Sequence, residues 1–408
     1  MTPPQDALWA AIRARPRDLQ PRHDLARQLA REGDPLGQVI AAALAHAAEK
    51  DRVARRPLEA RLNQLFDARK EPWFEKPPWF DREIGVGWVM EGGVPDALEL
   101  TNQESDRLAC ARWWTAHYPL RELRFTFCDP APVLAALAQD GHLARVESMV
   151  LNQCPLTAEC ATALQAAAPG LAGLRMHALA ADPGPLASLL TARGLASLER
   201  VHLTGAPLDR AEVHALAGLS SLRSLTLLES TVAEVDLSLS PSPRRALETI
   251  EIEGGFSEQQ LFQIFKLLDG LALAELRLRK AGLTEWFMRA LSSAAAQRKL
   301  QGLRVLDLRN NALDDTAMVV LRMADLPALK VLRLDCNRIG PEGLKALAAS
   351  RWAQQLEELG VGENELWSGR SQEFYDSSYG EPVGSYALRM TPDEVREKFG
   401  LPASLVLV

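Results

Sequence analysis

The 408-residue sequence lacks several features that would place it in a familiar functional class. It has no apolar run near the roughly 20 residues that a membrane-spanning helix needs. Its first residues carry Arg within their apolar pattern, so we expect neither a membrane anchor nor a signal peptide. The five cysteines form no Cys-x-x-Cys pair, and their number is odd. This usage suits a reducing compartment better than a disulfide framework, and we therefore expect a cytoplasmic protein.

Motifs for catalysis and nucleotide binding are also missing. The chain has no Gly-x-x-x-x-Gly-Lys-Ser/Thr loop, no Gly-x-Gly-x-x-Gly after a strand, no His-Glu-x-x-His and no Gly-x-Ser-x-Gly. Of the seven histidines, only His177 and His202 are expected to lie near each other, beside Arg175 and Arg200, which repel a cation. We therefore predict a protein that is not an enzyme, with no catalytic, metal or cofactor site.

A strong excess of positive charge is absent as well. The chain holds 46 Lys and Arg against 53 Asp and Glu, a net charge of −7, which argues against a general nucleic-acid binder. Residues 1–70 do carry 13 basic against 9 acidic side chains, but no aromatic residues are interleaved with these charges. We expect the partner to be another protein rather than a nucleic acid or a membrane.

The sequence does contain one eleven-residue pattern twice, 26 positions apart. The two copies consist of Leu303, Leu306, Leu308, Asn311 and Leu313, and of Leu329, Leu332, Leu334, Asn337 and Ile339. Both read L-x-x-L-x-L-x-x-N-x-L, the signature of a leucine-rich repeat. Leucines two apart point to the same face of a strand, and the Asn amide can bond backbone groups in the turn that follows.

Ten such units can be counted, separated by 24–30 residues. They begin at Leu120, Val146, Leu171, Leu198, Leu222, Leu247, Leu273, Leu303, Leu329 and Leu356. Cys128 and Cys154 take the Asn position in the first two units, so a structural role explains their presence and no reactive role is needed. The predicted fold class is α/β: a leucine-rich repeat solenoid with parallel strands on the concave face, helices on the convex face and an N-terminal helical domain. Its unit lengths resemble the ribonuclease-inhibitor type of repeat.

Residues 1–70 read as four helices. Asp6 is expected to cap the first, Pro21 to open the second, a third to run from Leu36 to about Arg55, and Pro57 to open the fourth. The segments AAIRARPRD (10–18), LARQLAREGDP (25–35) and GQVI (37–40) resemble the repeat-companion domain of bacterial leucine-rich repeat proteins. Arg27-Gln28 departs from the Asp-Trp pair common in that family. The resemblance implies an architecture and no activity.

The remaining chain divides into three parts. Residues 71–118 hold five of the nine tryptophans, Trp73, Trp79, Trp88, Trp113 and Trp114. We expect an irregular N-terminal cap there that ends in a strand near Ala97–Leu100, with an aromatic ligand site as the alternative. Residues 119–366 hold the repeats. In residues 367–408 we expect a structureless loop with Tyr375, Tyr379 and Tyr386, which either binds a partner or packs as a lid, and then a C-terminal cap.

The outward positions of the strands gather charge in units six to nine. The candidate partner-binding residues are Glu251, Glu253, Arg277, Arg279, Asp307, Arg309, Arg333 and Asp335, together with Tyr375 and Tyr379. One hypothesis is that this concave wall recognises a partner with complementary charges. The other is that pairs such as Arg277 with Glu251, or Arg333 with Asp307, only neutralise each other.

Two functions fit this pattern. The first is a non-enzymatic protein–protein interaction module, a scaffold that binds its partner through the concave face of the repeats. The alternative is a sensor or regulatory subunit of a bacterial multi-protein defence or signalling system. The bacterial ubiquitin ligases that carry leucine-rich repeats use a Cys-x-Asp nucleophile, and no cysteine here has Asp two positions later.

Overall fold

The architecture comes from a computed structural model. It describes residues 3–407 except 16, 68–86, 92–93, 102–106, 168–169, 178–184, 192–194, 196, 233–246, 255, 258–259, 262–272, 297, 376–381 and 403–404. The chain divides into two compact units, Met1–Leu198 and Glu199–Val408.

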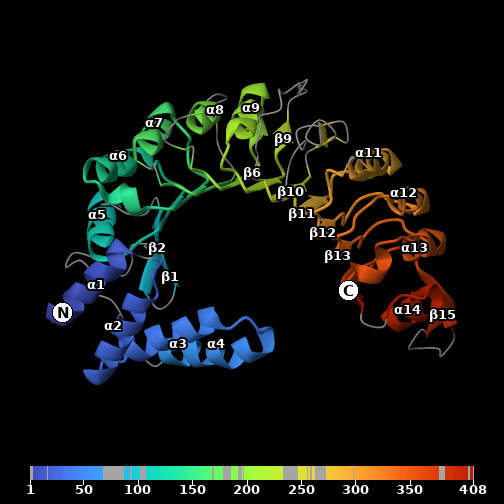
Figure 1. Ribbon diagram of the computed structural model, residues 1–408, viewed down its shortest axis with the longest axis horizontal. Helices are drawn as coiled ribbons and strands as arrows, with labels where there is room; N and C mark the ends of the chain where they lie inside the picture. The colour runs from blue at the N-terminus through green and yellow to red at the C-terminus, as the bar shows by residue number, and fades with distance from the viewer. Residues whose placement is uncertain are drawn as a thin grey trace. The chain divides into compact units, whose positions relative to one another are not determined.

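The first unit combines four N-terminal helices with the start of a parallel sheet (Figure 1). The helices are α1 (Pro3–Ala14), α2 (Gln20–Arg31), α3 (Leu36–Ala48) and α4 (Arg52–Asp67). The strands, in spatial order, are β1 (Gly87–Glu91), β2 (Val94–Thr101), β3 (Glu122–Thr126), β4 (Ser148–Asn152) and β5 (Gly173–His177). Strand β1 is antiparallel to β2, and the others are parallel. One face of the sheet is covered by α5 (Arg107–His117), α6 (Ala131–Gln139), η1 (His142–Arg145), α7 (Ala158–Ala167) and α8 (Pro185–Leu190).

The second unit continues the same alternation of strand and helix. Its parallel strands follow the order β6 (Arg200–Thr204), β8 (Ser224–Leu228), β10 (Thr249–Glu253), β11 (Glu275–Arg279), β12 (Val305–Asp307), β13 (Val331–Arg333), β14 (Glu358–Gly360) and β17 (Val406–Leu407). The helices beside them are α9 (Arg210–Gly218), α11 (Glu285–Ala296), α12 (Asp315–Leu321), α13 (Pro341–Ala348), η3 (Ala353–Gln355) and α14 (Pro392–Phe399). The short strands β7 (Pro207–Leu208) and β9 (Thr231–Val232) pair with each other.

The predicted repeat frame is confirmed in all ten units. Each predicted first residue, from Leu120 to Leu356, is at most 7% exposed, and each strand begins two residues later. In β10, for example, Ile250 and Ile252 are buried while the residues between and beside them are half-buried. The leucine-rich repeat solenoid predicted as the fold class is therefore the observed fold.

A left-handed backbone residue follows the strands in both units. It lies immediately before the position that Asn holds in the repeat pattern, and its φ lies between 48° and 67°. The residues are Phe127, Gln153, Gly205, Glu229, Gly254, Lys280, Asn310, Cys336 and Glu363. In the first eight of these residues the N–H donates to a carbonyl of the following repeat at 2.7–3.3 Å. This bond offsets the roughly 1–2 kcal/mol that the conformation costs a residue with a Cβ.

The last three repeats carry Asn at the next position, and the amide bonds the backbone on both sides. Asn337 Nδ2 donates to the carbonyls of Leu308 (3.0 Å) and Leu334 (2.8 Å), and its Oδ1 accepts from Leu313 N (3.1 Å). Asn311 and Asn364 make equivalent bonds. Each amide thus joins neighbouring repeats through groups that the strand ladder does not reach.

The N-terminal helices differ from expectation at three points. Helix α1 begins at Pro3, so Asp6 lies in its first turn rather than at its cap. The third helix ends at Ala48 rather than near Arg55, and Pro57 lies inside α4. The reason is Asp51, whose Oδ1 accepts from Val53 N at 2.6 Å and starts α4 well before the proline.

A chain of ion pairs fixes α2 to the first strands. Arg121 binds Asp96 through two bonds of 2.7 and 3.0 Å, and Arg22 Nη2 lies 3.9 Å from the same carboxylate. Arg17, in the connection before α2, binds both oxygens of Glu147. The Arg22 side chain is 2% exposed, so the Asp96 carboxylate beside it offsets the cost of burying its charge.

Residues 71–118 contain more regular structure than expected. The predicted strand is present as β2, but α5 follows it and was not expected. Trp114 of α5 is fully buried, and its ring lies 4.9 Å from that of Tyr118. Trp73 and Trp79 lie outside the described residues, as does the side chain of Trp88.

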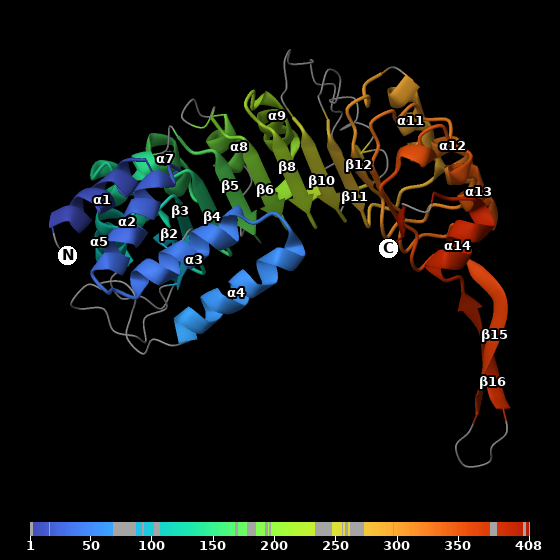
Figure 2. The same ribbon diagram turned by 60° about the horizontal axis from the view of Figure 1, so that its bottom comes forward.

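The expectation of a structureless loop over 367–386 is wrong. Strands β15 (Trp367–Tyr375) and β16 (Pro382–Arg389) form an antiparallel hairpin that extends away from the repeats of the second unit (Figure 2). The aromatic residues interspersed with Ser and Gly fit a paired strand as well as a loop, which is why composition misled. The predicted cap helix is confirmed as α14, with a capping box from Thr391 to Glu394 and Gly400 in the left-handed conformation at its end.

We predict that Asn337→Ala lowers the free energy of unfolding by about 1–3 kcal/mol, because buried backbone groups of two repeats lose their partner. Equilibrium urea unfolding measures the change. Asn152→Ala, at an outward position of β4, serves as the control and should cost little. Equal midpoints for the two variants would show that the Asn337 amide is dispensable.

We also predict that Asp96→Asn costs about 3 kcal/mol, since it removes the carboxylate beside buried Arg22. Asp140→Asn is the matched control: it breaks the exposed pair with Arg112 and should cost less than about 1 kcal/mol. Thermal and urea unfolding of both variants test the difference. A similar small loss for both would contradict a structural role of the Asp96 ion pairs.

Candidate functional site

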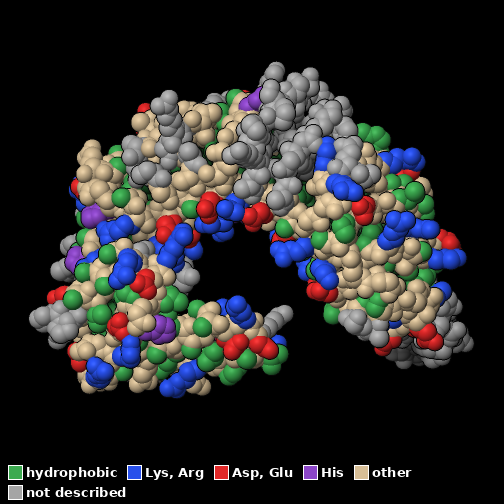
Figure 3. Space-filling model, in the orientation of Figure 1, with side chains coloured by type: hydrophobic (Ala, Val, Ile, Leu, Met, Phe, Trp, Pro, Cys, Tyr) green, Lys and Arg blue, Asp and Glu red, His purple; other side chains and the backbone are tan. Residues whose placement is uncertain are grey.

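The candidate site lies on the face of the second unit's sheet that the helices leave open. Because side chains alternate along each strand, the residues between the buried leucines and isoleucines point to this face. We call ten of them the charged wall: Glu251, Glu253, Glu275, Arg277, Arg279, Asp307, Arg309, Arg333, Asp335 and Glu358. Figure 3 shows basic and acidic side chains gathered together along these strands.

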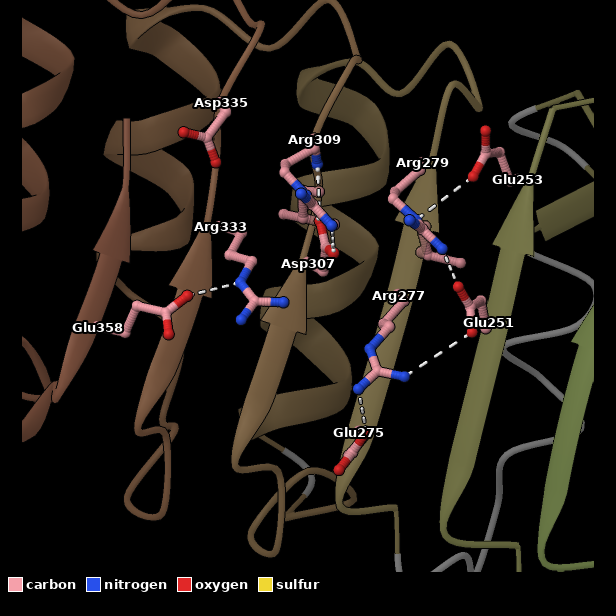
Figure 4. A network of polar contacts seen from close by, with 12 residues as sticks. Glu251, Glu253, Glu275, Arg277, Arg279, Asp307, Arg309, Arg333, Asp335 and Glu358 are labelled. Carbon is pink, nitrogen blue, oxygen red and sulfur yellow. Dashed lines mark hydrogen bonds and ion pairs between the residues drawn. The ribbon is translucent and has the colours of Figure 1, made fainter. Parts of the chain in front are cut away.

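Over β10 and β11 the charges form a continuous chain of ion pairs (Figure 4). Arg277 lies between Glu275 (2.5 Å) and Glu251 (3.7 Å). Arg279 binds Glu251 as well, and its Nε lies 3.5 Å from Glu253. Each carboxylate on β10 therefore contacts at least one guanidinium on β11. This arrangement follows from the parallel register, which places residue 251 opposite 277 and residue 253 opposite 279.

Over β12 and β13 the pairing differs from the prediction. Arg309, just after the end of β12, binds Asp307 of that strand with two bonds of 2.9 and 2.7 Å. Arg333 donates instead to Glu358 of β14 at 2.6 Å. The predicted pair of Arg333 with Asp307 is thus replaced. Asp307 is 0% exposed, and the bidentate fork of Arg309 satisfies both its oxygens. The same contact raises the pKa of Arg309.

The end of the wall at β14 has no side chains on two outward positions. A Cβ at residue 360 would lie 2.3 Å from Asp335 Oδ2, so Gly360 leaves room for that carboxylate. Asp335 Oδ1 accepts from Gly362 N at 2.9 Å. Within the described residues Asp335 has no ion pair, and Arg333 uses one of its five N–H donors.

The structure brings together all eight charged residues predicted from the sequence. It adds Glu275 and Glu358, which the sequence analysis missed. Both are the first residues of their strands, and only the two later outward positions of each repeat were considered. Lys280 was also missed; its Nζ lies 2.7 Å from Glu253, which raises the pKa of the lysine. Tyr375 lies at the end of β15, and Tyr379 falls outside the described residues.

The other polar residues give no sign of chemistry. Among the described residues no group of three or more His, Cys, Asp and Glu side chains could hold a metal ion. His202 bonds Thr204 of its own strand at 3.2 Å, and burial lowers the pKa of His177. No described helix has the length and apolarity required to cross a membrane.

The cysteines at the Asn position bond the backbone. Both thiols are buried. Cys128 Sγ donates to the carbonyl of Leu100 at 3.6 Å, and Cys154 Sγ donates to that of Asn152 at 3.4 Å. The interaction with the Cys128 side chain lowers the pKa of the Cys154 thiol to about 7. These contacts resemble those of the Asn amides in the last three repeats, so the two residues have a structural role.

Comparisons with known proteins concern the repeats. A family model described as a leucine rich repeat matches residues 326–348. An internalin from Listeria monocytogenes is 16% identical, with 66% of this chain and 81% of that chain covered and a TM-score of 0.33. The yeast Rad7 and Elc1 complex is 16% identical, with 60% of this chain and 64% of that chain covered and a TM-score of 0.42. The mouse RP105/MD-1 complex is 15% identical, with 67% of this chain and 51% of that chain covered and a TM-score of 0.40.

We predict that Arg309→Ala costs about 3 kcal/mol of unfolding free energy, because it leaves the buried Asp307 carboxylate without its cation. Arg333→Ala removes a partly exposed pair and should cost less than about 1 kcal/mol. Urea unfolding of the two variants gives the comparison. If Arg333→Ala proved as costly as Arg309→Ala, burial of Asp307 would not govern the stability of the wall.

Proposed function

We propose that this leucine-rich repeat protein is a non-enzymatic scaffold that binds a partner protein through the charged wall. The observation that carries the proposal is the collection of ten charged side chains of both signs on one open face, supplied by five neighbouring strands. Nine of them are partly exposed, which leaves them within reach of a partner. Repeat arrays of this kind present extended surfaces for binding.

The pairing within the wall indicates what a partner must offer. Five basic side chains, the wall arginines and Lys280, face six acidic ones, so the surface attracts neither strongly acidic nor strongly basic proteins. A partner must instead place its own charges in register with those of the wall, which gives specificity more than raw affinity. The proposed partner therefore carries interspersed acidic and basic residues.

The contact would centre on the end of the wall at β13 and β14. Arg333 keeps unused donors there, and Asp335 has an acceptor without a cation among the described residues. Gly362 is exposed and has no side chain, which allows a partner backbone to approach closely. A carboxylate of the partner fits the fork of Arg333, and a Lys or Arg of the partner fits Asp335. Tyr375, at the end of β15, and Tyr379, which follows it in the sequence, are proposed as a separate contact for the partner.

Charge reversal tests the proposal. We predict that Arg277→Glu with Arg333→Glu leaves the fold intact and lowers capture of the native partner at least tenfold, measured by affinity capture with quantitative mass spectrometry. Arg309 is not substituted, because it also stabilises the buried Asp307. The control reverses two exposed charges on the helices, Arg289→Glu with Lys345→Glu, and should retain the partner.

Two further variants locate the contact. Tyr375→Ser with Tyr379→Ser should weaken capture with little change in melting temperature. Capture that survives the wall variants and disappears only when residues 1–70 are deleted would refute binding through the wall and place it on the helical domain. The identity of the captured protein then separates a scaffold from a sensor subunit of a larger system.

A further inference from the structure

A second surface of the same unit lies at the ends of the helices. The turn after α12 and the segment after α13 enclose a groove of about 830 Å³. Its apolar lining includes Val319, Met323, Leu326, Pro327 and Trp352. Arg322, Asp325 and Arg351 add charge to this lining. The groove shares no residue with the charged wall.

The groove is held open by bonds between neighbouring repeats. Trp352 Nε1 donates to the carbonyl of Ala324 at 3.1 Å, and Gln355 Nε2 donates to that of Leu326 at 2.9 Å. Both donors lie in the segment after α13, and both acceptors lie in the turn after α12. The turn is thus fixed in place without a ligand, and little ordering would be needed for binding.

Two apolar side chains of the lining are exposed, whereas Leu326 and Trp352 are buried. Met323 is 80% exposed, more than any other large hydrophobic side chain that the structure describes, and Val319 on the same helix end is also exposed. An unbranched thioether adapts to partners of different shape, and methionine is frequent at surfaces that bind peptides. Neighbouring exposed apolar side chains in a concave site favour an apolar ligand group.

The charges of the groove select the sign of the ligand. Arg322 and Arg351 are exposed, and within the described residues neither side chain forms an ion pair or a hydrogen bond, in contrast to the arginines of the wall. Asp325 accepts from Gln301 Nε2 at 3.1 Å. Two uncommitted guanidiniums against one carboxylate leave the groove positive beside its apolar floor.

We propose that this groove binds an extended segment of a partner protein in which an apolar side chain is flanked by Asp or Glu. The apolar side chain packs against Met323 and Val319. The acidic neighbours accept from the forks of Arg322 and Arg351, which carboxylates fit in a bidentate manner. The site is independent of the proposed wall contact, and one chain can therefore hold two partners or two parts of one partner.

Selection from a phage-displayed library of random short peptides against the full chain tests this inference. We expect enriched peptides that share an apolar residue next to Asp or Glu. Their binding, followed by fluorescence anisotropy, should weaken at least tenfold in Met323→Ser and in Arg322→Gln with Arg351→Gln. Both variants change exposed side chains, so folding is unaffected. Replacement of the peptide carboxylates by Gln should weaken binding to a similar extent.

The wall variant Arg277→Glu with Arg333→Glu is the matched control and should bind the selected peptides as the natural chain does. A library that yields no enriched peptide, peptides without acidic residues, or binding that Met323→Ser leaves unchanged would overturn the inference. Peptides lost only in the wall variant would assign them to the wall and leave the groove without a ligand. Failure of the groove therefore does not affect the test of the wall.

Discussion

A hydrogen bond from one left-handed residue to the next repeat sets the geometry on which the solenoid depends. The residue before the Asn position turns the chain out of the strand and directs its N–H to the following repeat, as Asn310 does to the carbonyl of Asp335 at 3.0 Å. This turn brings the next side chain inward, where Asn337, Asn364 or Cys154 meets buried backbone groups. Strand spacing, leucine burial and the direction of the outward side chains all follow from it.

Periodic features were predictable from the sequence, and individual contacts were not. The leucine spacing predicted ten strands and their buried residues because burial acts equally on each repeat. It also identified which charges share the open face. It did not identify the partner of Arg333. The choice between Asp307 and Glu358 depends on side-chain torsions and on the ion pair that Arg309 forms with Asp307.

Local signals failed where two of them competed. Pro57 suggested a helix start, but the cap at Asp51 begins α4 earlier, so the proline lies inside the helix. The Gly and Ser content of 367–386 suggested a loop, although aromatic residues such as those of this segment also favour strands, here β15 and β16. The groove had no sequence signal, since Met323 and Arg351 meet only when two repeats stack.

The left-handed turn after β13, in the ninth repeat, has a practical consequence. Four of the five cysteines are buried, whereas Cys336, held in that turn next to Asp335, is exposed. A maleimide dye added to the natural chain would therefore attach at one place, beside the wall and away from the leucine core. The protein offers its own attachment point for a fluorescent reporter, without removal of any other thiol.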